Sequence, residues 1–446
     1  MRNSIVALHG KDEEAQQAER DERRLAIAAC CFLAFPSFKD CVVLFGSLVG
    51  ISSGITSAVS YAILVVVLLR AIPSVLRRMS WPDLGLFSAL LFVLLASWIA
   101  NPSSVYSGLF VGLVAMLLTQ CLGMYFICRS IRDWEQCWRF MGIASLAILV
   151  MQGIILVIPS NSGFLADSYS QSFSYQTLPA AAYYLVSLFK RPKVLTLLLF
   201  IASVGLIVAS GTRGPLAALA VLAVVLFVLE KRLGIWRIII ASAIVVVVLF
   251  SQDLLIVVLA AMRDVFESFG LSTRILDVLY EGNFFASNER PILIGNVLHL
   301  ISAAPLTGYG IGGDRIAIAT AMGGLDEVSG YYAHNFFLEC MMQYGLIAGA
   351  LISVAVCWLF MRAISASSGA GRAVVLTMLG AGFAPLLVSS SYMGFPLFFM
   401  CVALCIVAGQ EPQTTEAKTE GSEAESLKTE GLGGDTADAF RSSASR

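Results

Sequence analysis

The stretch VLTLLLFIASVGLIVASGTRGPLAALAVLAVVLFVL, residues 194–229, decides the fold class. It consists of two apolar runs joined by a short turn, and Arg213 in that turn is its only charged residue. A helix needs roughly 17 to 25 mainly apolar residues to cross the hydrocarbon core of a bilayer. The stretch therefore predicts a pair of membrane-spanning helices with one cation at the turn between them.

The rest of the chain has the same character. Of its 446 residues, 58% are hydrophobic and only 13% are charged, and the mean hydropathy is +0.82. A soluble core of this composition is implausible, so we predict an all-α integral membrane protein. Apolar runs of spanning length predict twelve transmembrane helices, near residues 25–50, 52–70, 81–100, 104–128, 137–159, 173–189, 194–210, 215–230, 235–260, 335–361, 372–388 and 393–409.

The first of these spans has an alternative interpretation. Pro36, Lys39 and Asp40 interrupt its apolar run. It is therefore either a full span or a short span followed by a re-entrant piece.

Polar segments divide the chain into three regions. Residues 1–24 are charged with both signs and lack the positive region and cleavage site of a signal peptide, so we expect a cytoplasmic segment there. Residues 25–409 form the membrane domain, with one large loop at about 263–333. Residues 410–446 are rich in Glu, Ser, Thr and Gly, which predicts a disordered cytoplasmic tail.

Basic residues alternate between the short connections. Lys and Arg occur in every second connection: Arg77, Arg78, Arg129, Arg132, Lys190, Arg191, Lys193, Lys231, Arg232, Arg237, Arg362 and Arg372. By the positive-inside rule this set is cytoplasmic. Both termini are then inside, while the Arg213 turn and the large loop face outward.

Several site classes find no support in the composition. The ten cysteines lie in or beside apolar runs without a C-x-x-C motif, so they resemble small hydrophobic residues more than metal ligands or disulfides. The outer loops show no Cys, His and Asp cluster with ligand spacing, and we expect neither metal nor cofactor. The net charge of −1 does not suggest nucleic acid as a partner.

Arg213 lies in the turn Ser210-Gly211-Thr212-Arg213-Gly214, directly before Pro215. Glycines allow close backbone approach and proline suits a first helical turn. The amides of that helix start and the guanidinium together form a possible anion site, to which Thr212 and Gly214 belong. The alternative is an arginine that extends to the lipid headgroups.

The large loop contains a second arginine, Arg290, at the start of a segment with helical periodicity. Its apolar positions, Leu293, Val297, Leu300 and Ile301, predict an amphipathic helix on the membrane surface, with Asn296 and His299 toward its polar side. Arg290 either binds an anion or lies in the interface. Arg274 competes with it as the functional arginine of the loop.

His334 follows the loop, where the next span begins, and is one of only three histidines. An imidazole there can accept a proton at neutral pH, although lone histidines are often structural. Glu339 lies inside the predicted span, which suggests a partner or a polar cavity, or a purely structural hydrogen bond between helices. Five residues separate it from His334, roughly 140° around a helix, so we do not pair the two.

These motifs in this order carry a resemblance. Ser-Gly-Thr-Arg-Gly lies between two spans; a large loop follows with an Arg-led helix and Pro-Leu-Thr-Gly-Tyr-Gly; and His-Asn-Phe-Phe-Leu-Glu-Cys-Met-Met-Gln-Tyr-Gly-Leu-Ile enters the next span. The chain thereby resembles the O-antigen ligase and O-antigen polymerase family, most specifically over residues 205–355. By motif, the family's functional residues correspond to Arg213, Arg290 and His334.

The resemblance implies a metal-independent membrane glycosyltransferase of the C-type architecture in the plasma membrane. Its donor would be a polyprenyl-diphosphate-linked oligosaccharide, and its acceptor a glycan or lipid-anchored sugar on the outer face. Arg213 and Arg290 would stabilise the diphosphate, and His334 would be the base or orient the acceptor. We place Thr212, Gly214, Asn335, Glu339 and Arg274 among the substrate-binding residues. Membrane lipids and a chain-length regulator are further expected partners.

Other classes stay open at this point. A secondary transporter or a lipid-linked glycan flippase also has about twelve spans, although the sequence shows no similar halves and almost no charge within the spans. A non-catalytic scaffold in an envelope complex is a further possibility. Ligase and polymerase use the same donor, and the residues do not distinguish them or identify the sugars.

Overall fold

The computed structural model describes residues 2–100, 104–158, 171–210, 212, 214–229, 260–261, 263–265, 267–268, 289–324 and 330–410. Within these ranges the secondary structure is helical, with turns and no strand. The α-helices are α1 (Arg2–Leu48), α2 (Ser53–Arg78), α3 (Trp81–Ala100), α4 (Ser104–Met116), α5 (Leu122–Arg129), α6 (Trp134–Val157), α7 (Gln171–Lys190), α8 (Val194–Ala209), α9 (Gly214–Leu229), α13 (Glu289–Ala303), α14 (Gly313–Met322), α15 (Phe336–Ala366), α16 (Gly369–Met378) and α17 (Pro396–Ala408). Short π or 3-10 segments are η1 (Leu117–Cys121), η4 (Leu379–Phe383), η5 (Ala384–Leu387) and η6 (Tyr392–Gly394).

Seven helical segments in the described ranges are long and apolar enough to cross a membrane. The helices α8, α9 and α17 are also apolar but shorter. The predicted class, an all-α membrane protein with several spans, is confirmed. The predicted number of twelve is not: the span at 235–260 lies outside the described residues except for residue 260, and several other predicted spans fall short of the spanning length.

The helix α1 is continuous over 47 residues, about 70 Å at 1.5 Å per residue. Pro36 lies inside it, so the re-entrant alternative for the first span is wrong. The polar residues of this stretch are accommodated without a break because they have protein partners. Ser37 Oγ accepts a hydrogen bond from Gln152 (2.8 Å), and Asp40 accepts one from Gln176 (2.7 Å).

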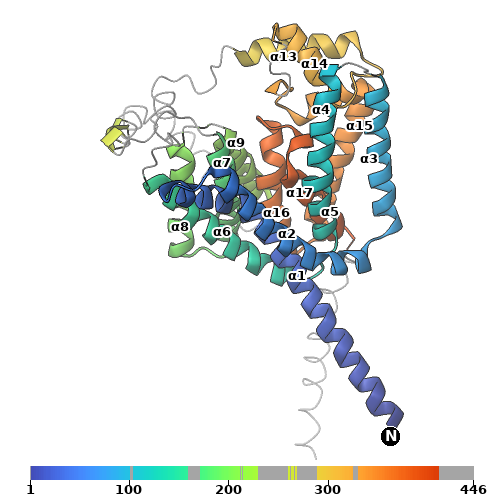
Figure 1. Ribbon diagram of the computed structural model, residues 1–446, viewed down its shortest axis with the longest axis vertical. Helices are drawn as coiled ribbons and strands as arrows, with labels where there is room; N and C mark the ends of the chain where they lie inside the picture. Colours follow the sequence, from blue (N-terminus) through green and yellow to red (C-terminus); the bar gives the residue numbers. More distant parts are fainter. Residues whose placement is uncertain are drawn as a thin grey trace, which may run out of the picture.

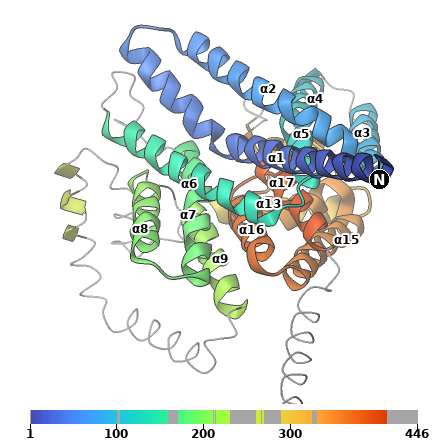
Figure 2. The ribbon, with the colours of Figure 1, turned by 90° about the horizontal axis from the view of Figure 1, so that it is seen from below.

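The helices form two groups with α16 and α17 between them. Figures 1 and 2 show α6, α7, α8 and α9 on one side, and α3, α4, α5 and α15 on the other. The long α1 packs against both α2 and α6. The C-terminal helices therefore lie at the centre of the bundle, where most of α16 and α17 is buried.

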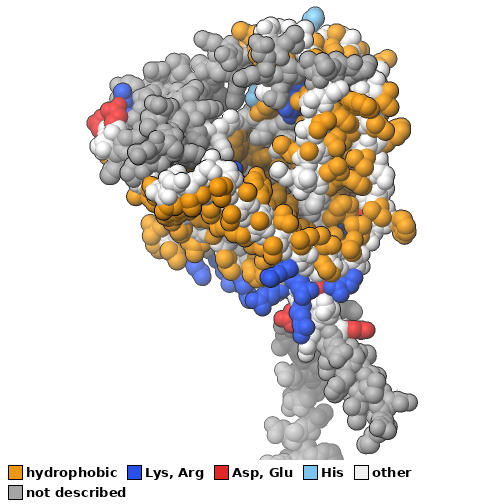
Figure 3. Space-filling view, viewed as in Figure 1, with side chains coloured by type: hydrophobic (Ala, Val, Ile, Leu, Met, Phe, Trp, Pro, Cys, Tyr) orange, Lys and Arg blue, Asp and Glu red, His pale blue; other side chains and the backbone are white. Residues whose placement is uncertain are grey.

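Charged residues gather at one end of the bundle, where α1 leaves it in Figure 3. Asp21 of α1 accepts hydrogen bonds from Ser74 (2.9 Å) and Arg77 (2.8 Å). Arg129 pairs with Asp83 at 3.1 Å. Glu22 of α1 accepts hydrogen bonds from the backbone N–H groups of Arg132 (2.9 Å) and Asp133 (3.0 Å). Two connections predicted to share a membrane face, 77–80 and 129–133, are thus in contact with the same turn of α1.

At the opposite end, α13 and α14 lie across the ends of the spans (Figure 1). Leu293, Val297 and Ile301 of α13 are buried against residues of α14 and α15, whereas His299 is exposed. This confirms the predicted helix and its buried apolar face. The predicted polar side is not confirmed: Ile292, Ile294 and Leu298 are exposed beside His299, and Asn296 is half-buried, where its side-chain amide donates to Met322 Sδ.

Candidate functional site

The glycine-rich turn after α13 docks onto a kink in α15. The kink occurs at Gly345, whose φ is 80°. Tyr309 N–H donates to Met342 O (2.8 Å), Gly310 N–H to Gln343 O (3.0 Å), and Leu346 N–H to Pro305 O (2.7 Å). The kink leaves backbone carbonyls of α15 without their helical partners, and the turn supplies new ones. The loop region is thereby fixed to the start of α15.

We expect Gly345→Ala to destabilise the protein by about 2–4 kcal/mol, since a side chain at positive φ is strained and must also find room. A Cβ at Gly345 would lie 2.4 Å from Leu306 O. The measurement is thermal unfolding in detergent. Gly205→Ala in α8 is the matched control, because its Cβ would meet nothing within 4 Å. Equal unfolding temperatures for the two variants would contradict this role of the kink.

His334 lies immediately before α15 in a strained backbone conformation. Its φ is 53°, and it is the only non-glycine residue with positive φ in the described ranges. Such outliers persist when surrounding contacts hold them, and they are frequent in functional sites. Asn335, the next residue, caps α15 by accepting from Phe337 N–H (3.0 Å) and Leu338 N–H (3.2 Å).

The imidazole of His334 has a defined orientation. Its Nδ1 lies 3.1 Å from Ser389 O. A carbonyl only accepts hydrogen bonds, so Nδ1 must be the donor, and the neutral ring then carries its lone pair on Nε2. The ring also packs on Tyr332, with 4.0 Å between the ring centroids.

Ser389 is the point where several segments meet. The hydroxyl of Tyr332 donates to Ser389 O (2.7 Å), and the Tyr175 and Ser389 hydroxyls are hydrogen-bonded. Gly214 packs so closely here that a Cβ would lie 2.2 Å from the Tyr175 hydroxyl and 2.8 Å from Ser389 Oγ. The first residue of α9 is thus brought to the serine that orients His334.

Thr212, on the other side of Arg213, is also anchored. It is buried, and its hydroxyl donates to Ser174 of α7. Arg213 itself lies outside the described residues, as does Arg274. The backbone of Arg290 belongs to the first turn of α13, but its side chain is not described.

Glu339 is fully buried inside α15. Its carboxylate accepts hydrogen bonds from the Ser391 hydroxyl, from Tyr392 N–H (3.3 Å) and from Gln343 Nε2 (3.5 Å). These partners fit the alternative of a structural hydrogen bond between elements. They also explain how a carboxylate is tolerated in a spanning helix.

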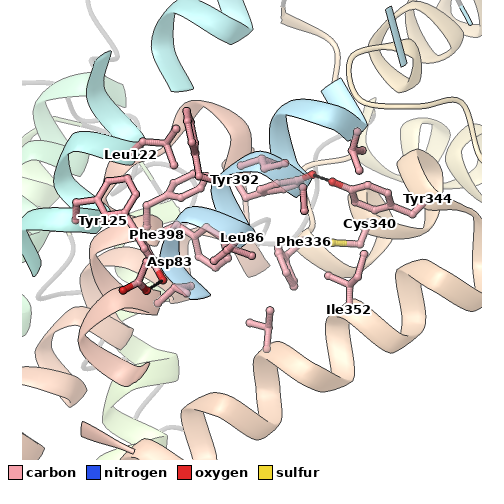
Figure 4. A pocket seen from close by; sticks show the side chains of 18 residues that line it. Asp83, Leu86, Leu122, Tyr125, Phe336, Cys340, Tyr344, Ile352, Tyr392 and Phe398 are labelled. Carbon is pink, nitrogen blue, oxygen red and sulfur yellow. Dashed lines mark hydrogen bonds between the residues drawn. The ribbon is translucent and has the colours of Figure 1, made fainter. Parts of the chain in front are cut away.

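Two cavities flank the segment 392–399. One, of about 500 Å³, lies between α1, α2, η1 and α7 and is lined by Tyr175 and Phe395. The other, of about 340 Å³, is mainly apolar and lies between α3, α5, α15 and α17. Figure 4 shows the second cavity, with the hydroxyl pair of Tyr344 and Tyr392 (2.9 Å) at one end and Asp83 at the other.

Residues 198–353 match the family model Wzy_C, described as O-antigen ligase. The predicted resemblance to the O-antigen ligase family is confirmed. No curated protein matches the chain. The matched segment runs from α8 into α15 and contains Arg213, Arg290 and His334 together with the glycine-rich turn.

The matched segment also contains two site residues that the sequence analysis missed, Arg315 and Tyr332. Arg315 is only 8% exposed; its guanidinium donates to Ser391 Oγ (3.1 Å) and lies over the Tyr332 ring, 5.6 Å from its centroid. Tyr332 links this arginine to His334. The available signal was a charged pair, Asp314-Arg315, directly after a glycine-rich turn in a chain with few charges.

Asp314 is fully buried beside Arg315. It accepts from Gly312 N–H (3.0 Å) and Gln343 Nε2 (3.2 Å). Burial raises the pKa of the Asp314 carboxyl, and the positive charge of Arg315 opposes that shift. Among the described residues no group of three or more His, Cys, Asp and Glu side chains is arranged to hold a metal ion.

Proposed function

We propose that the protein transfers or polymerises glycan from a polyprenyl-diphosphate-linked donor to a sugar hydroxyl on the outer face of the plasma membrane, in surface polysaccharide synthesis. One observation carries the proposal: within a segment that matches the O-antigen ligase family, His334 and Gly214, the residue after Arg213, both lie against Ser389. A base and an anion-binding turn are the two groups that this chemistry needs.

In the proposed reaction, the oxygen of the acceptor hydroxyl bonds to the anomeric carbon of the donor. The bond from that carbon to the diphosphate oxygen breaks, and its electron pair leaves with the polyprenyl diphosphate. The Nε2 lone pair of His334 accepts the hydroxyl proton. Arg213 and Arg290 stabilise the negative charge on the leaving group, which is the task a divalent cation performs in other transferases.

We assign the isoprenoid part of the donor to the cavity between α1, α2, η1 and α7. Its wall combines apolar residues of α1 and α2 with Tyr175, which contacts Ser389 and Gly214. A lipid chain bound there would have its diphosphate end close to the turn that contains Arg213. The cavity thus supports a lipid-linked donor over a soluble nucleotide sugar.

The proposed orientation places the basic end of the bundle in the cytoplasm and the α13 and α14 end outside. A cysteine introduced at Leu306, which is 74% exposed beside α13, should react with a membrane-impermeant maleimide in intact cells. A cysteine at Val194, which is 76% exposed after the Lys190–Lys193 connection, should react only after permeabilisation. Labelling at position 194 in intact cells, with labelling at position 306 only after permeabilisation, would show that the orientation is the reverse of the proposed one.

The function is tested with purified protein in sealed lipid vesicles, a polyprenyl-diphosphate-linked oligosaccharide, a sugar acceptor and a chelator, with no energy source. A transferase releases polyprenyl diphosphate and joined glycan in equal amounts. A flippase or secondary transporter moves the donor across a vesicle membrane and leaves its sugar–diphosphate bond intact. Transfer that requires added Mg²⁺ or Mn²⁺ would refute the metal-independent mechanism.

A further inference from the structure

Arg315 is the buried cation that connects the elements around His334. It extends from the first turn of α14, and this turn is itself fixed: Ile311 N–H donates to Ser97 Oγ (3.2 Å), and the Tyr106 hydroxyl donates to Ile311 O. From this turn the guanidinium donates to Ser391 and lies over the face of Tyr332. It therefore connects α14 to the Tyr332 ring and to the Ser389–Tyr392 turn, the two parts of the structure that contact the imidazole.

We propose that Arg315 is a positioning residue, which holds the His334 imidazole in its reactive orientation through Tyr332 and the Ser389–Tyr392 turn. The inference rests on the proposed role of His334 as general base. It adds a residue for which the sequence motifs assigned no role.

The first route from Arg315 to His334 runs through Tyr332. The guanidinium lies over one ring, and that ring packs on the imidazole. The Tyr332 hydroxyl and His334 Nδ1 both donate to the same carbonyl, Ser389 O. A shift of the tyrosine would thus disturb both the packing of the imidazole and its hydrogen-bond acceptor.

The second route runs through the turn that carries this acceptor. Arg315 donates to Ser391, two residues after Ser389, and the Ser391 hydroxyl donates in turn to Glu339. The turn is held between the cation of α14 and the carboxylate of α15. Arginine suits this position because its planar guanidinium can donate a hydrogen bond and lie over an aromatic ring at the same time.

Charge balance explains how the cation is tolerated at this depth. Asp314 and Glu339 both interact electrostatically with Arg315. A buried charge without such partners would be strongly unfavourable. The same charge interactions suggest an alternative to the positioning role, in which Arg315 only neutralises buried carboxylates and stabilises the fold.

The first test uses the small number of histidines and needs no transfer activity. In a His9→Gln, His299→Gln variant, His334 is the only histidine of the chain. Its modification by diethylpyrocarbonate, followed at 240 nm, should become several-fold faster with Arg315→Gln, because the ring loses its fixed packing. An unchanged rate would overturn the proposal. If the parent protein proved not to transfer glycan, the proposed function would fail, but this rate would still report on the imidazole.

The second test is a double-mutant cycle on transfer. Arg315→Gln should lower kcat about tenfold with a donor KM within about twofold, and should have no further effect in a His334→Ala background. A raised KM and an equal loss in both backgrounds would show instead that Arg315 contacts the donor. A loss of activity that only follows a loss of thermal stability would assign Arg315 to the fold alone; both outcomes overturn the proposal.

Arg362→Gln is the matched control for both tests. Arg362 lies near the C-terminal end of α15, whereas His334 lies just before its N-terminal end. The guanidinium of Arg362 also lies over an aromatic ring, that of Trp358, 5.3 Å from the ring centroid. Removing it takes away a cation–π contact without touching Tyr332 or Ser391. We expect parent values for modification rate and kcat. A loss equal to that of Arg315→Gln would show that the effect is not specific to the site.

Discussion

His334→Ala should lower the rate of glycan transfer by about 10²- to 10⁴-fold, the usual contribution of a general base. The loss should appear in kcat with little change in donor affinity, because the base acts on the acceptor proton in the transition state. The structure supports this expectation through the strained φ of 53° and the fixed Nδ1 hydrogen bond to Ser389 O. Single-turnover transfer with purified protein provides the measurement, together with donor binding to the variant.

The internal control for this substitution is His299→Ala. His299 lies on the exposed side of α13, and its backbone carbonyl accepts a hydrogen bond from the Ser302 hydroxyl (2.6 Å). We expect transfer close to the parent rate. Product formation by the His334 variant at the parent rate, or a severe loss with the His299 variant, would mean that the base has been assigned to the wrong histidine.

The fold class was predictable because lipid imposes a simple rule on sequence. Each helix of spanning length contains an apolar run, since a spanning segment needs both sufficient length and sufficient hydropathy, although α1 also extends over the charged residues 2–24. The apolar face of α13 followed from its periodicity alone, and Leu293, Val297 and Ile301 are buried accordingly. Pro36 shows the limit of local signals: it suggested an interruption, yet packing against α2 and α6 keeps α1 continuous.

The site was predictable only where a residue type stands out against an apolar background. His334 and the Arg213 turn are of this kind, and the structure brings Gly214, the residue after Arg213, to the serine that orients His334. Ser389 and Tyr332 were not predictable as partners, because 57 residues separate the two and neither has a periodic or compositional signal. Their contact depends on how η5, α15 and α9 meet, and that is a property of tertiary packing.

Arg213→Lys should lower transfer about 10- to 100-fold, which corresponds to the loss of one charge-assisted hydrogen bond of roughly 1.5–3 kcal/mol. Lysine keeps the positive charge but not the planar fork that binds two phosphate oxygens together. The flanking positions give little freedom for compensation, because Thr212 is buried and hydrogen-bonded to Ser174 and Gly214 lies against Tyr175 and Ser389.

The matched control for Arg213→Lys is Arg191→Lys, an exposed arginine at the basic end of the bundle. Both substitutions conserve charge at a helix connection, so both should leave membrane insertion and abundance unchanged. Only the first should reduce transfer, and the loss should be larger in kcat than in donor affinity if the fork acts mainly on the charge that develops as the diphosphate leaves. Parent-level transfer by Arg213→Lys would show that a point charge suffices there, and the arginine at this turn would then serve the membrane interface instead of the leaving group.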